Sequence, residues 1–350
     1  MTAAFSNARD VIARRRDRVT LRKTLVSCAA LALALVAAVV LLSLVGSEPL
    51  PARASLCALL SLGTSPCGLS QDQFDILFQI RLPRILLAAA VGGSLATAGA
   101  SYQALLRNPL AEPYLLGISN GAAVGTMVAL VFFGANEWSR PLLAFAGSLV
   151  ATLAVYQLAR GRAGATPERL ILAGVIVTTF LSSVIVFVTT LMDATRVRSF
   201  TFWLLGDLSG TSKALLPVAL SIAVVGTVAL TLHARSLNLL MLGERDAFDL
   251  GVEVGRVRIV VFVVASLLVG SSVAASGSVG YVGLVVPHLA RLSLGSDNRI
   301  SIPAAALGGA LFVIVADTVA RTVIAPRELP VGAITALIGA PLFIYLLKRA

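Results

Sequence analysis

Long apolar segments dominate this chain, and short polar connections separate them. Most of the ten segments approach the roughly 20 residues that an α-helix needs to cross about 30 Å of hydrocarbon. They cover residues 24–46, 82–106, 115–134, 141–159, 170–191, 214–233, 258–276, 279–294, 302–320 and 330–347. The eighth segment is short and rich in glycine, so the pattern predicts nine or ten membrane-spanning helices.

Composition agrees with this pattern. The 350 residues are 57% hydrophobic and only 13% charged, with a mean hydropathy of +0.92. A soluble domain is about 45–50% apolar and about 25% charged, and the connections leave no room for a sizeable soluble domain. We therefore predict an all-α integral membrane protein, with residues 1–23 as a basic cytoplasmic tail and residues 24–350 as a single transmembrane domain.

The first apolar segment has two interpretations. It follows a basic stretch, and the sequence PARA at 51–54 resembles a signal-peptidase cleavage site. The apolar core of a signal peptide, however, is about 7–15 residues long, and this segment is longer. The length favours an uncleaved first helix.

The placement of Lys and Arg predicts the orientation, because cytoplasmic connections of membrane proteins are enriched in these residues. With the N-terminus in the cytoplasm and ten spans, most of the 28 Lys and Arg residues lie inside, whereas the 17 acidic residues divide almost evenly. Both ends are then cytoplasmic. The net charge of +11 is explained by topology. The sequence therefore predicts that the chain is surrounded by a lipid bilayer and that it does not bind nucleic acid.

Several arginines remain on the predicted outer side. Arg81 and Arg84 begin the second span in the sequence RLPR, and Arg321 ends the ninth. Each could extend its guanidinium to lipid headgroups. Together they could instead form a basic collar that recognises acidic groups of a docking protein.

The three cysteines have different surroundings. Cys28 lies in the first span and is expected to be a small buried apolar residue. Cys57 and Cys67 share the first outer loop, where the compartment permits a disulfide. Two free thiols and one Cys57–Cys67 bridge both remain open, and in either case the pair is not catalytic.

Catalytic and metal-binding motifs are missing from the sequence. It contains no G-x-x-x-x-G-K-[ST] phosphate loop, no G-x-S-x-G and no H-E-x-x-H. The two histidines, His233 and His288, lie in different segments without neighbouring ligands and are expected to be satisfied at helix ends. We predict a non-enzyme with no metal site and no cofactor of its own.

Ion-coupled transport would need an ionisable residue inside a span. Asp317 is the one convincing candidate, but Arg321 follows it by four residues on the same helix face, and a local ion pair is the simpler interpretation. The spans are otherwise too apolar for a channel lining. The chain therefore resembles a passive pathway with an external energy source, and a secondary transporter that uses Asp317 is the alternative.

Three long motifs carry a family resemblance. They are RLPRILLAAAVGGSLATAGASYQALLRNPLAEPYLLGISNGAAVG from residue 81, MLGERDAFDLGVEVGRVR from residue 241, and GYVGLVVPHLARLSLGSDNR with ADTVARTVIAPRELPVGAITALIGAPLFIYLLKR towards the C-terminus. Together they resemble the FecCD-type permeases, the membrane subunits of ABC importers for iron chelates, haem and vitamin B12. The resemblance covers nearly the whole chain from about residue 78.

The resemblance implies a type II ABC importer permease-like bundle of about ten helices in the cytoplasmic (inner) membrane. It implies a second permease subunit, either an identical copy or a paralogue, with two cytoplasmic ATPase subunits that bind ATP. It also implies an extracytoplasmic binding protein that delivers the substrate. We expect a ferric siderophore as the substrate, with vitamin B12 or haem as the alternative within the family.

The resemblance also assigns roles to residues. The connection at 234–258 is expected to form two short helices that sit in a groove of the ATPase, with Gly251 suited to cap a helix between them. The matching coupling residues are Leu242, Gly243, Glu244, Ala247, Leu250, Gly251 and Val252. Glu244, Arg245, Asp246 and Asp249 suit a polar, separable interface. In the family, Arg81, Arg84 and Arg321 would face acidic residues of the binding protein.

The pathway is predicted along the fifth span, its continuation to FWLLGDLSG and the tenth span. The candidate lining residues are Thr178, Thr179, Ser182 and Ser183, although such hydroxyls also bond to their own helix backbone. Asn108 and Pro109 mark a break after the second span. That break is either a simple turn or a cytoplasmic element near the gate.

Overall fold

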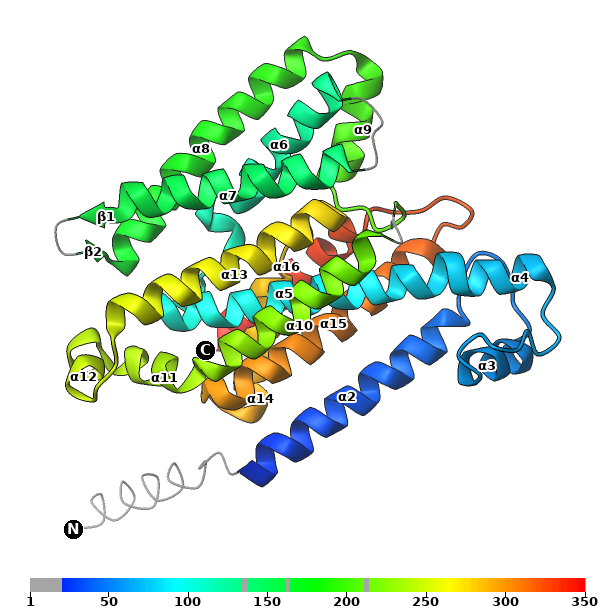
Figure 1. Ribbon diagram of the computed structural model, residues 1–350, viewed down its shortest axis with the longest axis horizontal. Coiled ribbons are helices and arrows are strands. Elements are labelled where there is room, and N and C mark those ends of the chain that lie inside the picture. Colours follow the sequence, from blue (N-terminus) through cyan, green and yellow to red (C-terminus); the bar gives the residue numbers. More distant parts are fainter. Residues whose placement is uncertain (1–20, 134–137, 162–163, 211–213, 350) are drawn as a thin grey trace.

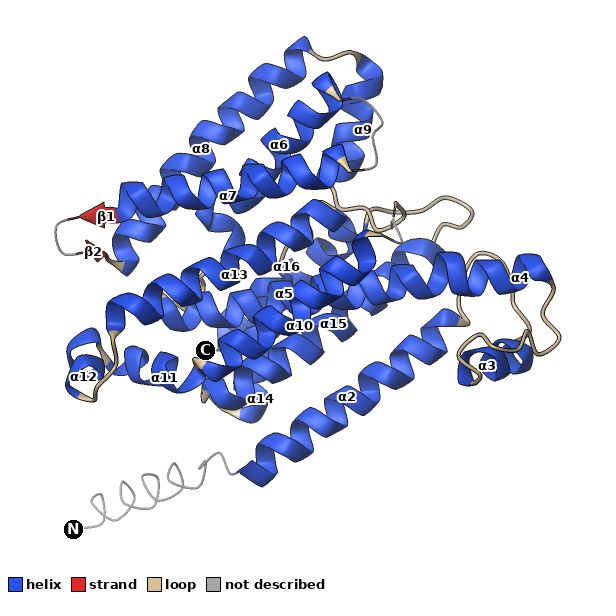
Figure 2. Ribbon diagram, viewed as in Figure 1, coloured by secondary structure: helices blue, strands red, loops and turns tan. Residues whose placement is uncertain are grey.

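The chain folds into a helical bundle in which each predicted span contains one helix. The computed structural model describes residues 21–133, 138–161, 164–210 and 214–349. The predicted tail of residues 1–23 therefore lies outside the described residues except for its last three. Among the described residues the only strands are the two-residue pair β1 (Arg160–Gly161) and β2 (Gly164–Ala165) (Figure 2).

The first half of the chain supplies five spanning helices and the outer elements. These are α2 (Leu21–Ser43), α3 (Ala52–Leu60), α4 (Gln71–Asp75), the π-helix η1 (Ile76–Arg81), α5 (Leu82–Leu105), the 3₁₀ turn η2 (Pro113–Leu116), α6 (Ile118–Phe132), α7 (Ser139–Ala159) and α8 (Pro167–Leu191). The second half supplies α9 (Ala194–Leu204), α10 (Leu215–Leu232), α11 (Ala234–Leu242), α12 (Glu244–Asp249), α13 (Val254–Ser276), α14 (Val282–Leu294), α15 (Asn298–Thr322) and α16 (Val331–Arg349).

Length and hydropathy identify the membrane helices. Six described helices are long and apolar enough to cross a bilayer, namely α2 from Arg22, α7, α8, α10, α13 and α15. The helices α6, α14 and α16 are shorter but apolar, and α5 has 24 residues. These ten helices coincide with the ten predicted segments, so the short eighth span is present as α14.

The helices form a central group with a layer on one side and a single helix on the other. In Figure 1, α6, α7 and α8 form the upper layer, which packs on α13, while α2 crosses below and contacts α15. The end that carries α11 and α12 is called the inner face, and the end that carries α3 and α4 the outer face. The two faces lie at opposite ends of the bundle (Figure 1).

Helix α5 is the core of the bundle. Small side chains let other helices approach its backbone closely: a Cβ added at Gly92 would lie 2.1 Å from the carbonyl oxygen of Gly309 in α15. Nearer the inner end, fully buried Tyr102 donates a hydrogen bond to the carbonyl oxygen of Phe262 in α13, at 3.1 Å. Gly92 and Gly309 thus mark the point where α5 and α15 cross.

Helix α14 begins partway along the bundle instead of at its surface. A Cβ at Gly283, in its first turn, would lie 2.9 Å from the carbonyl oxygen of Leu95, near the middle of α5. Just before this turn, Tyr281 has a positive φ of 67° and donates its backbone N–H to Oε1 of Glu112 at 3.2 Å. Irregular backbone at this depth is tolerated because protein surrounds it.

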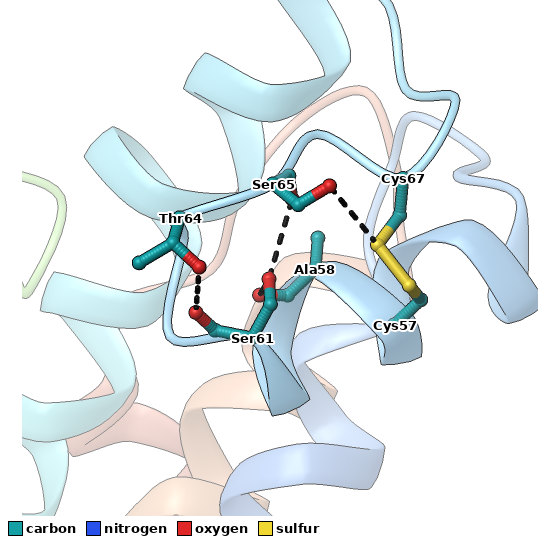
Figure 3. Close-up of a disulfide and its surroundings, with 6 residues drawn as sticks. All are labelled: Cys57, Ala58, Ser61, Thr64, Ser65 and Cys67. Carbon is teal, nitrogen blue, oxygen red and sulfur yellow. Dashed lines mark hydrogen bonds between the residues drawn. A yellow bond between two sulfur atoms is a disulfide. The ribbon is translucent and has the colours of Figure 1, made fainter.

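The outer loop has its own small core. The Cys57 and Cys67 sulfurs form a disulfide (Figure 3), which confirms the bridge that the sequence left open. Beside it, Ser61 donates its hydroxyl to the carbonyl oxygen of Ala58 at 2.9 Å. Buried Leu69 and Leu77 pack with Ala58 in this cluster. The bridge therefore ties α3 to the loop before α4, and the packing of Leu77 places this cluster against η1, which leads into the second span.

Candidate functional site

Two short helices form a hairpin on the inner face, as the resemblance implied for this connection. Helix α11 ends at Leu242 and α12 begins at Glu244. Gly243 lies between them with a φ of 144°, a conformation that L side chains rarely adopt. Gly251 does cap a helix, as expected: with a φ of 86° it ends α12, and the N–H of Val252 donates to the carbonyl oxygen of Ala247. Its expected place between the two short helices is wrong, because it follows α12 and precedes α13.

The hairpin exposes apolar side chains to solvent. Leu242, Phe248 and Leu250 are 66%, 70% and 62% exposed, whereas Ala247 is fully buried beneath them. Exposed Arg245, Asp246 and Asp249 surround this apolar patch. An apolar patch rimmed by polar groups is typical of a protein contact surface.

A cleft of about 410 Å³ opens beside this hairpin. It separates α11 from the segment that leads into α13. Its lining residues are Arg235, Ser236, Leu239, Leu250, Gly251, Val252, Glu253, Arg256 and Val257. Apolar patch and cleft together give the inner face a shaped surface that a protein partner could fill.

The Glu244 side chain contacts two arginines of the same chain. Its Oε1 lies 2.5 Å from the guanidinium of Arg258 in α13 and 4.0 Å from that of Arg107, just beyond α5. The Glu244 side chain is 39% exposed and that of Arg258 is 10% exposed. In the sequence, both arginines were only part of the inner-side charge that predicts orientation. Their contact with Glu244 was not predicted.

Helix α11 has a different anchor, at the start of α15. The Asn238 amide donates to Oδ1 of Asp297 at 2.7 Å. The side-chain oxygen Oδ1 of Asn238 accepts from the backbone N–H and from the side-chain amide of Asn298, both at 2.9 Å. Hydrogen bonds from Arg299 lower the pKa of Asp297 to about 2. No sequence signal pointed to this network.

On the outer face, an ion-pair cluster joins α5 to α15. The Arg84 guanidinium lies 2.9 Å from Oδ1 of Asp317 and 2.8 Å from Oε2 of Glu328. On the other side of the carboxylate, Nε of Arg321 lies 3.1 Å from Oδ2 of Asp317, as an ion pair without hydrogen-bond geometry. Asp317 is fully buried. The expected Asp317–Arg321 pair is confirmed, and Glu328 is an additional member that the sequence did not reveal.

The three arginines predicted for docking are all engaged within the chain. Arg81 is buried and donates to the carbonyl oxygens of Ser43, Leu44 and Glu48. Arg321 donates to the hydroxyl of Thr318 at 3.2 Å and to the carbonyl oxygen of Val45, in the same connection after α2, at 3.4 Å. The structure thus brings Arg84 and Arg321 together around one carboxylate, while Arg81 holds the connection after α2.

The predicted lining residues lie on a largely open side of α8. Thr179 and Ser183 are exposed, but their hydroxyls donate to the carbonyl oxygens of Val175 and Thr179 in the same helix. Asn120 of α6 donates to the hydroxyl of Ser182 at 2.7 Å and to the carbonyl oxygen of Thr178 at 3.0 Å. The hydroxyls are thus mostly satisfied within the protein.

The same helix face carries large apolar side chains. Ile176, Phe180 and Phe187 are 55%, 66% and 66% exposed. The continuation after α8 forms the separate helix α9, which Asp193 caps by accepting from the backbone N–H of Arg196 at 2.9 Å. Just past α9, the carbonyl oxygen of Gly206 accepts from the N–H of Val331 at the start of α16. The continuation and the tenth span, two of the three predicted pathway segments, are therefore in contact at this point.

No metal centre emerges from the residues that the structure describes. Among them, no group of three or more His, Cys, Asp or Glu side chains is placed to hold a metal ion. Nδ1 of His233 lies 2.9 Å from the carbonyl oxygen of Ala229, as expected for a histidine at a helix end. His288 makes an edge contact with the ring of Phe343.

Comparison with known proteins identifies this arrangement. The sequence matches the FecCD transport family over residues 31–349. The chain belongs to the FecCD transport family. It is 42% identical over 281 residues to the cobalamin import system permease protein BtuC of Halobacterium salinarum, covering 80% of this chain and 75% of that protein.

Other family members and one solved structure give the same result. The hemin transport system permease protein HmuU of Yersinia pestis is 41% identical, over 79% of this chain and 84% of its own. A solved structure of a metal-chelate type ABC transporter in an inward-facing conformation superimposes with a TM-score of 0.80 at 30% identity. It covers 93% of this chain and all of the other. This FecCD chain is thus a multi-pass transport permease of about ten membrane helices.

Proposed function

We propose that this FecCD permease is the membrane subunit of an ATP-driven ABC importer that carries a metal chelate, most specifically a ferric siderophore, into the cytoplasm. The observation that carries the proposal is the inner hairpin. It presents exposed Leu242, Phe248 and Leu250 to a protein partner, while the sequence holds no phosphate loop of its own. Two cytoplasmic ATPase subunits would bind ATP and contact this hairpin. The inner face, and with it both chain ends, is then cytoplasmic in the inner membrane.

A second permease subunit, identical or paralogous, would cover the open side of α8. The exposed Phe180 and Phe187 give this side an apolar surface, and the internally bonded hydroxyls of Thr179 and Ser183 give it few free polar groups. A lining of this kind holds a large chelate only weakly and so lets it pass. Cobalamin and haem are the alternative substrates, because the similar permeases BtuC and HmuU are named for cobalamin import and hemin transport.

Docking of an extracytoplasmic binding protein is proposed at Arg81, Arg84 and Arg321. The Glu328 side chain is 40% exposed and already occupies one side of the Arg84 guanidinium. An acidic group of the binding protein would therefore reach Arg84 by taking the place of Glu328. This exchange reconciles the engaged Arg84 of the isolated chain with a docking role.

Transport in proteoliposomes tests the function. The complex, purified with its ATPase and binding protein, is supplied with ferric siderophore, cobalamin or haem in turn, with and without ATP. We expect ATP-dependent uptake, with ferric siderophore preferred, that an uncoupler leaves unchanged. Uptake that persists without ATPase subunits and collapses with an uncoupler would contradict the proposal and return Asp317 to a coupling role.

Binding-protein affinity tests the docking exchange separately. Glu328→Gln is expected to strengthen binding of the co-purified binding protein, because the competing carboxylate is gone. Asp193→Asn, on the same face and in an exposed pair with Arg196, is the matched control. An equal effect of both variants would show that only general charge matters and would remove the exchange.

A further inference from the structure

A groove of about 610 Å³ separates part of α2 from α14 and α15. Three residues of α2, five of α14 and five of α15 line it. Ser27 and Ser293 are the polar residues of this lining, and the others are apolar. The volume lies in the range of about 300–1,000 Å³ that is typical of ligand sites. The groove is therefore large enough for a ligand, and its walls suit an apolar one.

The groove has the length of a lipid acyl chain. On α15 it extends from Ala304 to Val315, a rise of about 16 Å at about 1.5 Å per residue. One leaflet contributes about half of the roughly 30 Å of hydrocarbon in a bilayer. The inner end of the groove lies at Leu294, the last residue of α14. An acyl chain of the leaflet on the inner side can therefore lie along the groove.

Basic residues stand at the inner end of the groove. Lys23 precedes Ser27 by four residues and Ala30 by seven, so these three side chains share one face of α2. Arg22 is exposed beside Lys23, and residues 9–23 of the sequence contain seven Lys and Arg but two Asp. Basic groups next to a membrane helix attract anionic lipids. The charge at this end therefore complements a headgroup with a net negative charge.

The position of α2 in the bundle favours a lipid over a protein as the occupant. In Figure 1, α2 lies below the central helices and α8 lies above them, so a second permease subunit on the open side of α8 would not reach this groove. Leu25 and Leu33 of α2 are 61% and 71% exposed. An apolar span with such exposed side chains lies against hydrocarbon. Lipid chains therefore have direct access to the groove.

We propose that the groove binds one acyl chain of an anionic phospholipid, with the phosphate of the headgroup at Lys23. The chain fills the space between α2 and the pair α14 and α15. At the outer end, Arg81 already donates to the carbonyl oxygen of Ser43, the last residue of α2. The lipid provides the corresponding connection for the inner half of α2. This site requires neither an ATPase nor a transported substrate, so it is independent of the proposed function.

Native mass spectrometry of the full-length permease tests occupancy of the groove. The protein is released from nanodiscs of equimolar phosphatidylglycerol and phosphatidylcholine, and the lipids that stay bound are counted. We expect one retained phosphatidylglycerol per chain. Ala30→Phe is expected to remove it, because Ala30 is exposed in the groove wall and a ring there occupies the acyl-chain site. Retention by Ala30→Phe equal to that of wild type would overturn the proposal.

Ala29→Phe is the matched control. Ala29 is also exposed and lies on the same helix, but it is not part of the groove lining. The same ring is thus added to α2 without filling the groove, and the bound phosphatidylglycerol is expected to remain. Equal loss from both variants would show that the lipid responds to the surface of α2 in general, and would overturn the groove as its site.

The headgroup contact has a separate test. Lys23→Gln is expected to lower the retained phosphatidylglycerol about fivefold, the effect of one basic group beside an anionic lipid, and to leave retained phosphatidylcholine unchanged. Arg256→Gln removes a basic residue of the inner face whose pair with Glu253 is largely exposed, and is expected to change neither lipid. Equal retention of the two lipids by wild type, or equal effects of the two substitutions, would overturn the role of Lys23.

The same spectra detect a second copy of the chain in the groove. Dimers that Ala30→Phe dissociates, without loss of phosphatidylglycerol, would assign the groove to a protein contact and overturn the proposal. Failure of ATP-dependent uptake in proteoliposomes would contradict the proposed function, whereas the lipid count of the isolated permease still decides this site.

Discussion

Helices α5 and α15 are connected in opposite ways at the two faces of this permease. At the outer face, Arg84 and buried Asp317 bind them directly. At the inner face the ion pairs near their ends are those of Glu244, whose side chain is 39% exposed, and the amide network of Asn238 lies beside them. The comparison shows that an ion pair holds two helices strongly where water is excluded, whereas water and salt weaken an ion pair that is partly exposed.

Removal of an outer charge should have the largest effect. Arg84→Ala leaves Asp317 with Arg321 alone in a buried site, and loss of one partner of a buried pair costs about 3–5 kcal/mol of the free energy of unfolding. Denaturant unfolding in detergent micelles measures this loss. Arg196→Ala breaks the exposed pair with Asp193 and should cost no more than about 1 kcal/mol. Similar losses in both variants would erase the contrast between the two kinds of pair.

The crossing between the two faces should be the next most sensitive. A Cβ at Gly309 would lie 2.3 Å from the carbonyl oxygen of Gly92, so Gly309→Ala must push α5 and α15 apart. Overpacking of this kind costs about 1–3 kcal/mol. Gly255→Ala is the control, because it is also helical and has no atom within 4 Å of the added carbon. Thermal unfolding should show a loss only for Gly309→Ala, and an unaffected Gly309→Ala protein would refute the close crossing.

A smaller effect is expected at the inner ion pairs. Glu244→Gln should cost about 0.2–1 kcal/mol, because the group is partly exposed. The difference from wild type should shrink at about 1 M salt, where the screening length falls to about 3 Å. The deficit of Arg84→Ala should persist under the same conditions. Equal salt dependence of the two deficits would mean that both faces are similarly hydrated.

A change of pH tests the inner face in a second way. The pKa of Asp297 is lowered to about 2 in the fold, against about 3.9 in an unfolded chain. Its contribution is therefore present above about pH 4 and is lost as the pH falls toward 2. Stability followed between pH 5 and pH 2 should decline less steeply in Asp297→Asn. Parallel curves for the two proteins would show that Asp297 is not linked to folding.

Local sequence patterns predicted the spans and the short-range pairs. Hydropathy located all ten helices, because each residue contributes to it independently of its distant neighbours. The pairing of Asp317 with Arg321 followed from a four-residue separation on one helix, and the Cys57–Cys67 bridge lies within a single loop. These features depend on chain segments that remain close in any helical fold.

Partners far apart in sequence were beyond the same reasoning. Arg84 meets Asp317 across 233 positions and Glu328 across 244, and no periodicity encodes which helix packs against which. The place of Gly243 was likewise hidden, because a sequence shows that glycine occurs at 243 and 251 but not which of the two lies between the short helices. The Asn238–Asp297 network joins both difficulties, since its residues look like ordinary polar positions of a connection.

The early start of α14 has an electrical consequence. The first turn of a helix leaves N–H groups without helical partners and carries a partial positive charge of about half an electron unit. In hydrocarbon that charge would have no water to screen it, yet Glu112 accepts from the N–H of Tyr281 at this point. The Glu112 side chain and the helix end therefore attract one another, which favours a half-length helix that begins inside the bilayer.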